Sequence, residues 1–241
     1  MAGWGPIWSR PNGSIFFRRT LTHSYQSVCN MAMEPTRQPD LTRQSILSAA
    51  FCEIHRSGFQ AASIANILAN TGLTKGALYH HFPTKQALGL AVIDEVIRAR
   101  LEGLLFTRLR ESEEPVETLL DIIATIDKKV PSDFVMLGCP LNNLMQEMSA
   151  LDEIFQERLN GVLSIWQKTV EDALRRGQKQ GEIRSDVDYK AAALFIVSAW
   201  EGCIGVAKNM QSPKAFGVCM QQLHGYVQGL MPARAGKGRR K

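Results

Sequence analysis

Apolar residues recur along most of this chain at intervals of three and four residues, the spacing that places them on one face of an α-helix. The pattern is clearest between residues 152 and 180. There the stripe consists of Phe155, Leu159, Val162, Trp166, Val170, Ala173 and Gly177. No segment of useful length alternates apolar and polar residues as a half-buried strand would. The pattern therefore predicts an all-α protein.

Capping residues predict where further helices begin and end. Pro115 and Pro140 suit the first turn of a helix, where a missing N–H costs nothing, and Gly181 suits the end of the 152–180 helix. A helix over 187–208 is apolar around most of its circumference, and another follows from Pro213. Helices that are apolar on more than one face need more than one partner. We therefore expect a second copy of the chain to cover them, which makes a homodimer.

A different pattern lies between Ser63 and Phe82, where two short helical stretches are joined by a glycine. Ser63 suits the N-cap of the first stretch, and Gly72 ends it at a residue free to adopt positive φ. Thr74 suits the N-cap of the second, which Pro83 prevents from continuing. Helix, tight turn and short helix form the helix-turn-helix plan, whose second helix enters the major groove of DNA.

The second stretch carries side chains suited to that groove. The side chains that can donate hydrogen bonds to DNA are those of Thr74, Lys75, Tyr79, His80 and His81. Gly76 has no side chain and lets the protein backbone approach the DNA closely. Adjacent histidines on a helix point about 100° apart, so we expect no metal site at this pair.

The stretch from Gln44 to about Leu90 resembles the DNA-binding domain of the TetR (tetracycline-repressor) family of bacterial transcription regulators. The resemblance rests on Gly58-Phe59, on Ser63-Ile64-Ala65 and on the run from Gly72 to Phe82, which contains Lys-Gly-Ala-Leu-Tyr-His-His-Phe. It implies that Lys75 and Gly76 lie at base edges or the adjoining backbone. It also implies that Tyr79, His81 and Lys85 hold phosphates and that Ser63 caps its helix against the DNA backbone.

The same resemblance implies the organisation of the whole chain and its function. A three-helix DNA-binding domain over 39–88 (motif 63–82) would be followed by a helical effector-binding and dimerisation domain over 89–231. Such proteins are cytoplasmic regulators, more often repressors, which leave a palindromic DNA operator when a small molecule binds the helical body. No catalytic role and no cofactor are expected.

Candidate effector-site residues come from the body. Large apolar side chains that are candidates for lining the site are Met148, Phe155, Trp166 and Trp200. Cys139 precedes Pro140 and so falls at a helix N-cap, where free N–H groups and the helix dipole lower the pKa of a thiol. Gly-Cys-Pro-Leu also resembles a region of electrophile-sensing family members. Cys139 is therefore a candidate redox or electrophile sensor; the alternative is a small, buried, unreactive cap.

Charge is distributed unevenly along the chain. The net charge of +5 divides into +3 over residues 1–33, +2 over 34–90, −5 over 91–233 and +5 over 234–241. Positive charge thus belongs to the DNA-reading part and to both ends, where it would meet phosphate. Five cysteines without Cys-x-x-Cys or metal-ligand spacing suit a reducing cytoplasm.

The two ends of the chain show no helical periodicity. We expect residues 1–38 to be an unstructured extension, with the true start at Met31 or Met33, and 232–241 to be a basic tail. No apolar run approaches the roughly 20 residues that cross a bilayer, so no membrane contact is expected.

Two other classes of protein are weighed against this interpretation. An architectural protein would bind DNA without sequence preference, through its basic tail. An all-α enzyme would carry the helix-turn-helix pattern incidentally, but the chain has no paired Glu-x-x-His motif, phosphate loop or Gly-x-Ser-x-Gly elbow.

Overall fold

The computed structural model describes residues 38–69 and 71–233, and every regular element within those ranges is a helix. The predicted all-α fold is confirmed. The expected extension over 1–38 and the basic tail over 232–241 lie almost wholly outside the described residues.

We call residues 38–91 the head and the helices that follow it the body. The head consists of α2 (Gln38–Ser57), α3 (Ile64–Leu68), α4 (Lys75–His81) and α5 (Lys85–Ala91). A continuous rod leads out of the head through η1 (Val92–Ile97), α6 (Arg98–Leu101), η2 (Glu102–Phe106) and α7 (Thr107–Glu111), where η1 and η2 are π-helical. The body also contains α8 (Pro115–Lys129), α9 (Ser132–Leu137), α10 (Pro140–Met148), α11 (Glu153–Lys179), α12 (Tyr189–Met210) and α13 (Pro213–Gly229).

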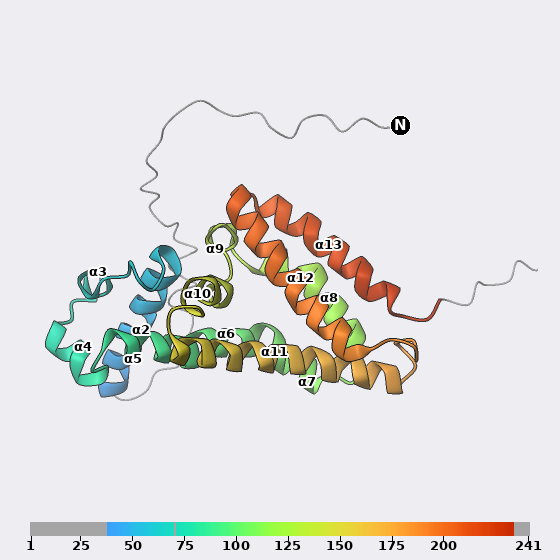
Figure 1. Ribbon diagram of the computed structural model, residues 1–241, viewed down its shortest axis with the longest axis horizontal. Coiled ribbons are helices and arrows are strands. Elements are labelled where there is room, and N and C mark those ends of the chain that lie inside the picture. Colours follow the sequence, from blue (N-terminus) through green and yellow to red (C-terminus); the bar gives the residue numbers. More distant parts are fainter. Residues whose placement is uncertain (1–37, 70, 234–241) are drawn as a thin grey trace, which may run out of the picture.

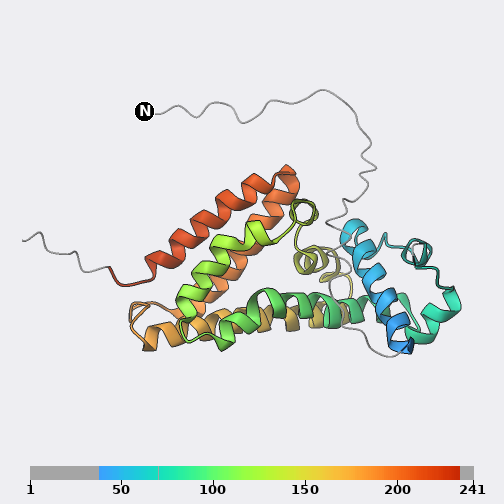
Figure 2. The same cartoon turned by 180° about the vertical axis from the view of Figure 1, so that it is seen from behind.

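The head forms one end of the molecule (Figure 1). The rod runs from it alongside α11, while α8, α12 and α13 pack together at the other end. The short helices α9 and α10 lie between the head and α12, and the view from behind shows the same arrangement (Figure 2). Because α10 touches both η1 and α11, it is wedged between the rod and the rest of the body.

Most predicted helix ends are confirmed. Pro115 and Pro140 each occupy the first turn of a helix, and Gly181 follows α11 with a φ of 79°. The seven predicted stripe residues of α11 are all buried. The sequence patterns missed α9, a six-residue helix after Pro131 that has no side-chain cap. So short an apolar stretch has no periodicity to detect.

Helix α12 is long and apolar enough to match a membrane span by composition, with a mean hydropathy of 1.4 over its best window. Within the fold, however, α12 packs against α11 and α13, and 44% of that window is buried. Core helices of soluble proteins pass the same test, so this helix does not indicate a membrane protein.

Candidate nucleic-acid interface and effector region

The caps of α3 and α4 are formed as the sequence predicts. The Ser63 hydroxyl accepts from the Asn66 backbone N–H at 3.0 Å, and the Thr74 hydroxyl accepts from that of Ala77 at 3.1 Å. Gly72, between the two helices, has a φ of 67°. These contacts fix the start of α4 and hence the direction in which its first residues point.

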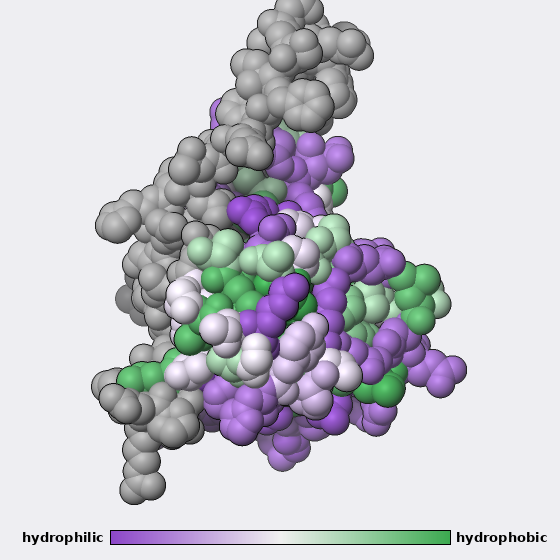
Figure 3. All heavy atoms as spheres, turned by 90° about the vertical axis from the view of Figure 1, so that its left-hand side faces the viewer, coloured by the Kyte–Doolittle hydropathy of each residue, from purple (hydrophilic) through white to green (hydrophobic). Residues whose placement is uncertain are grey.

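Helix α4 is anchored on one side and open on the other. Leu78 is fully buried in the core of the head, whereas Tyr79 is 46% exposed. Lys75, Gly76 and His80 are also exposed. This end of the molecule is drawn in Figure 3, where polar side chains surround a small apolar area. Of the residues predicted to face the groove, Thr74, Lys75, Gly76, Tyr79 and His80 thus share the outer surface of the head, and His81 is half-buried.

Lys85, the expected phosphate ligand, has partners inside the protein. Its Nζ donates to the carbonyl oxygen of Gln60 at 3.0 Å and lies 4.8 Å from the centre of the Phe59 ring. It therefore connects the start of α5 to the loop between α2 and α3.

That loop is also held by the body. Glu147, at the C-terminal end of α10, accepts from the backbone N–H groups of Phe59 and Gln60, both at 2.8 Å. Gly58 has a φ of 83°, and a Cβ there would lie 2.9 Å from a Glu147 carboxylate oxygen. The positive φ favours glycine at 58, and the missing Cβ leaves room for the carboxylate.

The other end of α10 reaches the head through His55. The His55 Nε2–H donates to the carbonyl oxygen of Gly138, 2.7 Å away, and its ring lies 4.7 Å from that of Phe134. Burial lowers the pKa of His55 to about 4, so the ring is neutral at physiological pH. Helix α10 and its leading turn thus hold the head at two points, and nothing in the sequence pattern identified His55 or Glu147.

Cys139 is the N-cap residue of α10, as predicted, but the expected lowering of its thiol pKa is wrong. The residue is only 9% exposed, and its side chain makes no capping hydrogen bond. Burial and the nearby Glu201 carboxylate raise its pKa well above the usual value, although backbone N–H groups of α10 act in the opposite direction. Desolvation outweighs the helix terminus here, so the thiol is poorly suited to reaction.

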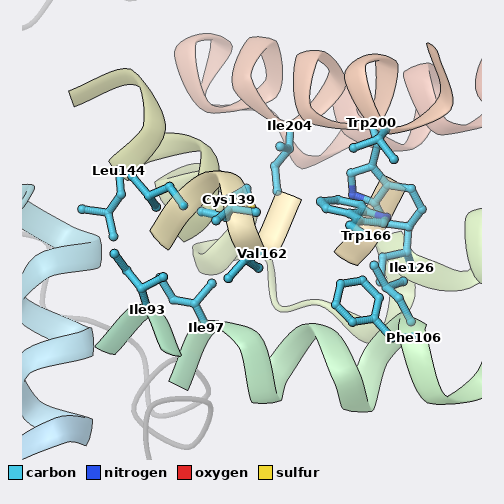
Figure 4. Close-up of a cluster of buried hydrophobic side chains, with 14 of the residues drawn as sticks. Ile93, Ile97, Phe106, Ile126, Cys139, Leu144, Val162, Trp166, Trp200 and Ile204 are labelled. Atoms are coloured by element: carbon cyan, nitrogen blue, oxygen red, sulfur yellow. The ribbon is translucent and has the colours of Figure 1, made fainter. Parts of the chain in front are cut away.

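The apolar candidates for the effector site all belong to one hydrophobic core, but they lie at separate places within it. Trp166 and Trp200 meet edge to face with ring centroids 5.7 Å apart, and Cys139 lies in the same buried cluster beyond Ile204 (Figure 4). Phe155 instead packs against Phe59, with centroids 4.5 Å apart, at the contact between head and body. Met148, on α10, is buried.

One polar residue in this region was not identified from the sequence. Glu201, on α12, is 6% exposed, and neither carboxyl oxygen has a conventional hydrogen-bond partner among the described residues. Burial raises its pKa to about 7. The sequence signal for Glu201 is a single acidic residue within an otherwise apolar helical stretch, here Ala199 to Ile204.

The outer face of α12 and α13 is apolar. Its exposed large side chains are Leu194, Phe195, Val206, Met210, Val218 and Tyr226. Phe195 and Tyr226 touch each other across the two helices, with ring centroids 4.5 Å apart. This is the face for which the sequence predicts a second copy of the chain.

Comparison with known proteins agrees with this architecture. Residues 46–92 match the family described as bacterial regulatory proteins, tetR family, and residues 115–223 match the tetracyclin repressor-like C-terminal domain. The transcriptional regulator AcuR of Cereibacter sphaeroides is 33% identical over 178 residues, which cover 72% of this chain and 80% of AcuR. The repressor DhaR of a Mycobacterium species is 27% identical over 147 residues, which cover 61% of this chain and 72% of DhaR.

Solved structures show the same fold. A TetR regulator from Chloroflexus aurantiacus superposes with a TM-score of 0.71 at 26% identity, covering 81% of this chain and 98% of its own. A TetR regulatory protein from Rhodobacter sphaeroides gives 0.69 at 29% identity, covering 77% and 98%. These relatives are regulators, which removes the enzyme alternative. The chain belongs to the tetR family of DNA-binding transcriptional regulators.

Proposed function

We propose that this regulator binds a palindromic DNA operator as a homodimer and is released from it by a small molecule bound in the body. The observation that carries the proposal is the presentation of α4. Its capped N-terminus, its buried Leu78 and its exposed Lys75 and Tyr79 form an ordered reading surface on the outside of the head. In this geometry the first residues of the second helix meet base edges.

The remaining DNA contacts follow from the same placement. Thr74, Gly76 and His80 share the exposed surface with Lys75, and His81 is half-buried beside them. Ser63 would meet the phosphate backbone at the start of α3, and Lys85 would exchange its contact with Gln60 for a phosphate.

The two-point hold of α10 on the head supports control from the body. A movement of α10 shifts the Gly138 carbonyl against His55 and the Glu147 carboxylate against the α2–α3 loop. Both contacts help to set where α3 and α4 lie relative to the head of the second copy of the chain. The burial and raised pKa of Cys139 favour a reversibly bound effector over an electrophile.

The test is fluorescence-anisotropy binding to the DNA that flanks the protein's own gene. We expect Lys75→Ala and Tyr79→Phe to weaken binding to the selected sequence by about 1–3 kcal/mol, the cost of a lost base or phosphate contact. Lys128→Ala, on α8, is the control and should bind like the original protein. Equal affinity for all sequences, together with a steep salt dependence, would instead identify an architectural DNA-binding protein.

A further inference from the structure

Glu201 is a buried acid in the helical body. It lies on α12 with 6% exposure, and both carboxyl oxygens are buried without a conventional partner among the described residues. Buried polar groups in folded proteins nearly always have a partner, and an isolated buried acid costs several kcal/mol. An acid kept in such a place therefore calls for an explanation from function.

Neighbouring polar groups are directed elsewhere. The Asn142 amide donates to the backbone oxygen of Glu201, at 3.3 Å, and not to its carboxyl group. The Lys208 ammonium, two turns further along α12, donates to the Asn143 side chain at 2.8 Å. The Cys139 thiol faces the carboxyl group, but a thiol is a weak donor. The described residues thus offer Glu201 no positive charge.

Cys139, whose thiol faces the Glu201 carboxyl group, belongs to an apolar and aromatic cluster. Cys139 lies among Leu144, Val162 and Ile204, and the Trp166–Trp200 pair occupies the other end of the same buried cluster (Figure 4). A carboxyl group beside such a region complements an organic cation, whose charge would favour the ionised form of the acid. Ammonium groups pair with carboxylates, and cations are attracted to indole faces.

We infer that Glu201 is the polar anchor of the effector site and that the effector is a small organic cation, a protonated amine on an apolar body. Its ammonium group faces Glu201. Its apolar part lies against Ile204 and the tryptophan pair and replaces contacts that these side chains now make within the core. This inference rests on the proposed function, because it names the chemical class of the effector.

The position of Glu201 also explains how the binding of such a ligand in the body affects the head. The Glu201 side chain faces Cys139, the residue that begins α10. Gly138, immediately before it, accepts the hydrogen bond from His55 of the head. An ammonium group seated at Glu201 therefore acts on the end of α10 that holds α2.

The test compares three probes with the same apolar part: hexylammonium, hexanol and hexanoate. Isothermal titration calorimetry measures the binding of each to the full-length protein and to Glu201→Gln, which keeps the shape of the side chain. Glu153→Gln, an exposed acid on α11, is the control variant. We expect hexylammonium to bind the original protein and the control at least about tenfold more tightly than hexanol, which corresponds to about 1.4 kcal/mol.

In Glu201→Gln the preference for the ammonium probe should disappear while hexanol binding is retained, which also shows that the variant is folded. Hexylammonium that binds no better than hexanol, a preference for hexanoate, or an ammonium preference that survives in Glu201→Gln would each overturn the inference. Operator binding without any probe is measured separately. Selective operator binding with no ammonium preference leaves the regulator intact and removes only the assigned effector class.

Discussion

His55 illustrates at the scale of one residue how the head depends on the body. The folded protein buries its neutral ring against Gly138 and holds the pKa near 4, whereas the unfolded chain binds a proton near pH 6.5. Between these two values the unfolded state carries more protons than the folded state. The contribution of His55 to stability is therefore complete above pH 6.5 and is lost as the pH falls towards 4.

We accordingly expect the free energy of unfolding to fall by up to about 1.4 kcal/mol per pH unit in this window through His55 alone. Urea unfolding of His55→Gln, whose amide also donates to a carbonyl, isolates the effect. The variant should show a shallower pH dependence than the original protein. Parallel curves for the two proteins would show that His55 does not titrate in this way.

Glu147 is the second contact of the same kind. Removing its carboxylate in Glu147→Ala leaves the N–H groups of Phe59 and Gln60 without their acceptor, so we expect a loss of about 1–3 kcal/mol in unfolding free energy. Gln146→Ala changes an exposed neighbour on α10 and should be nearly neutral. Equal losses in the two variants would contradict a specific role for the carboxylate.

At the scale of elements, the rod from η1 to α7 departs from simple helical periodicity. A 3.6-residue repeat places Leu101 and Leu104 on the inner face, but Leu104 is 38% exposed, while Leu105 and Phe106 are buried. The cause is the pair of π-helical segments, η1 and η2, which widen the turn and rotate the residues that follow. A regular helical repeat read from the sequence does not reveal this shift in register.

Two glycines, Gly89 on α5 and Gly103 on η2, provide a matched prediction. A Cβ at Gly89 would lie 2.5 Å from the Phe59 ring and 2.8 Å from that of Phe155, whereas one at Gly103 meets nothing within 4 Å. We expect Gly89→Ala to cost about 1–3 kcal/mol by overpacking, and Gly103→Ala to stabilise by up to about 1 kcal/mol through helix propensity. Thermal unfolding of both variants measures this. Similar melting temperatures for both would mean that the contact between head and body yields easily.

At the scale of the whole molecule, the apolar outer face of α12 and α13 is the surface at which we propose that the dimer forms. A glutamate in place of Phe195 or Val206, both about half exposed, would bury a charge in the proposed dimer. We expect Phe195→Glu and Val206→Glu to behave as monomers in light scattering and to lose affinity for a two-half-site operator. Leu151→Glu, at a site 63% exposed near the head, is the control and should remain a dimer. If the two glutamate variants of this face remain dimers, the dimer interface lies on another surface.

Local patterns of the sequence determined most of the fold. Caps at Ser63 and Thr74, prolines in first turns and apolar stripes act within a few residues of each other, so helix ends and the helix-turn-helix could be predicted without tertiary information. The same holds for the exposed face of α4, because Leu78 alone sets which side is buried.

Tertiary structure decided the chemistry of the body. Helices that are far apart in sequence decide whether Cys139 is exposed, which acid faces it and which aromatic rings meet. Burial reversed the shift in the Cys139 pKa that the helix terminus alone predicts. The contacts of His55 and Glu147 with the head and body likewise join residues more than eighty positions apart. Capping acts along the chain, whereas desolvation depends on everything that surrounds a group, and only the packed structure supplies that.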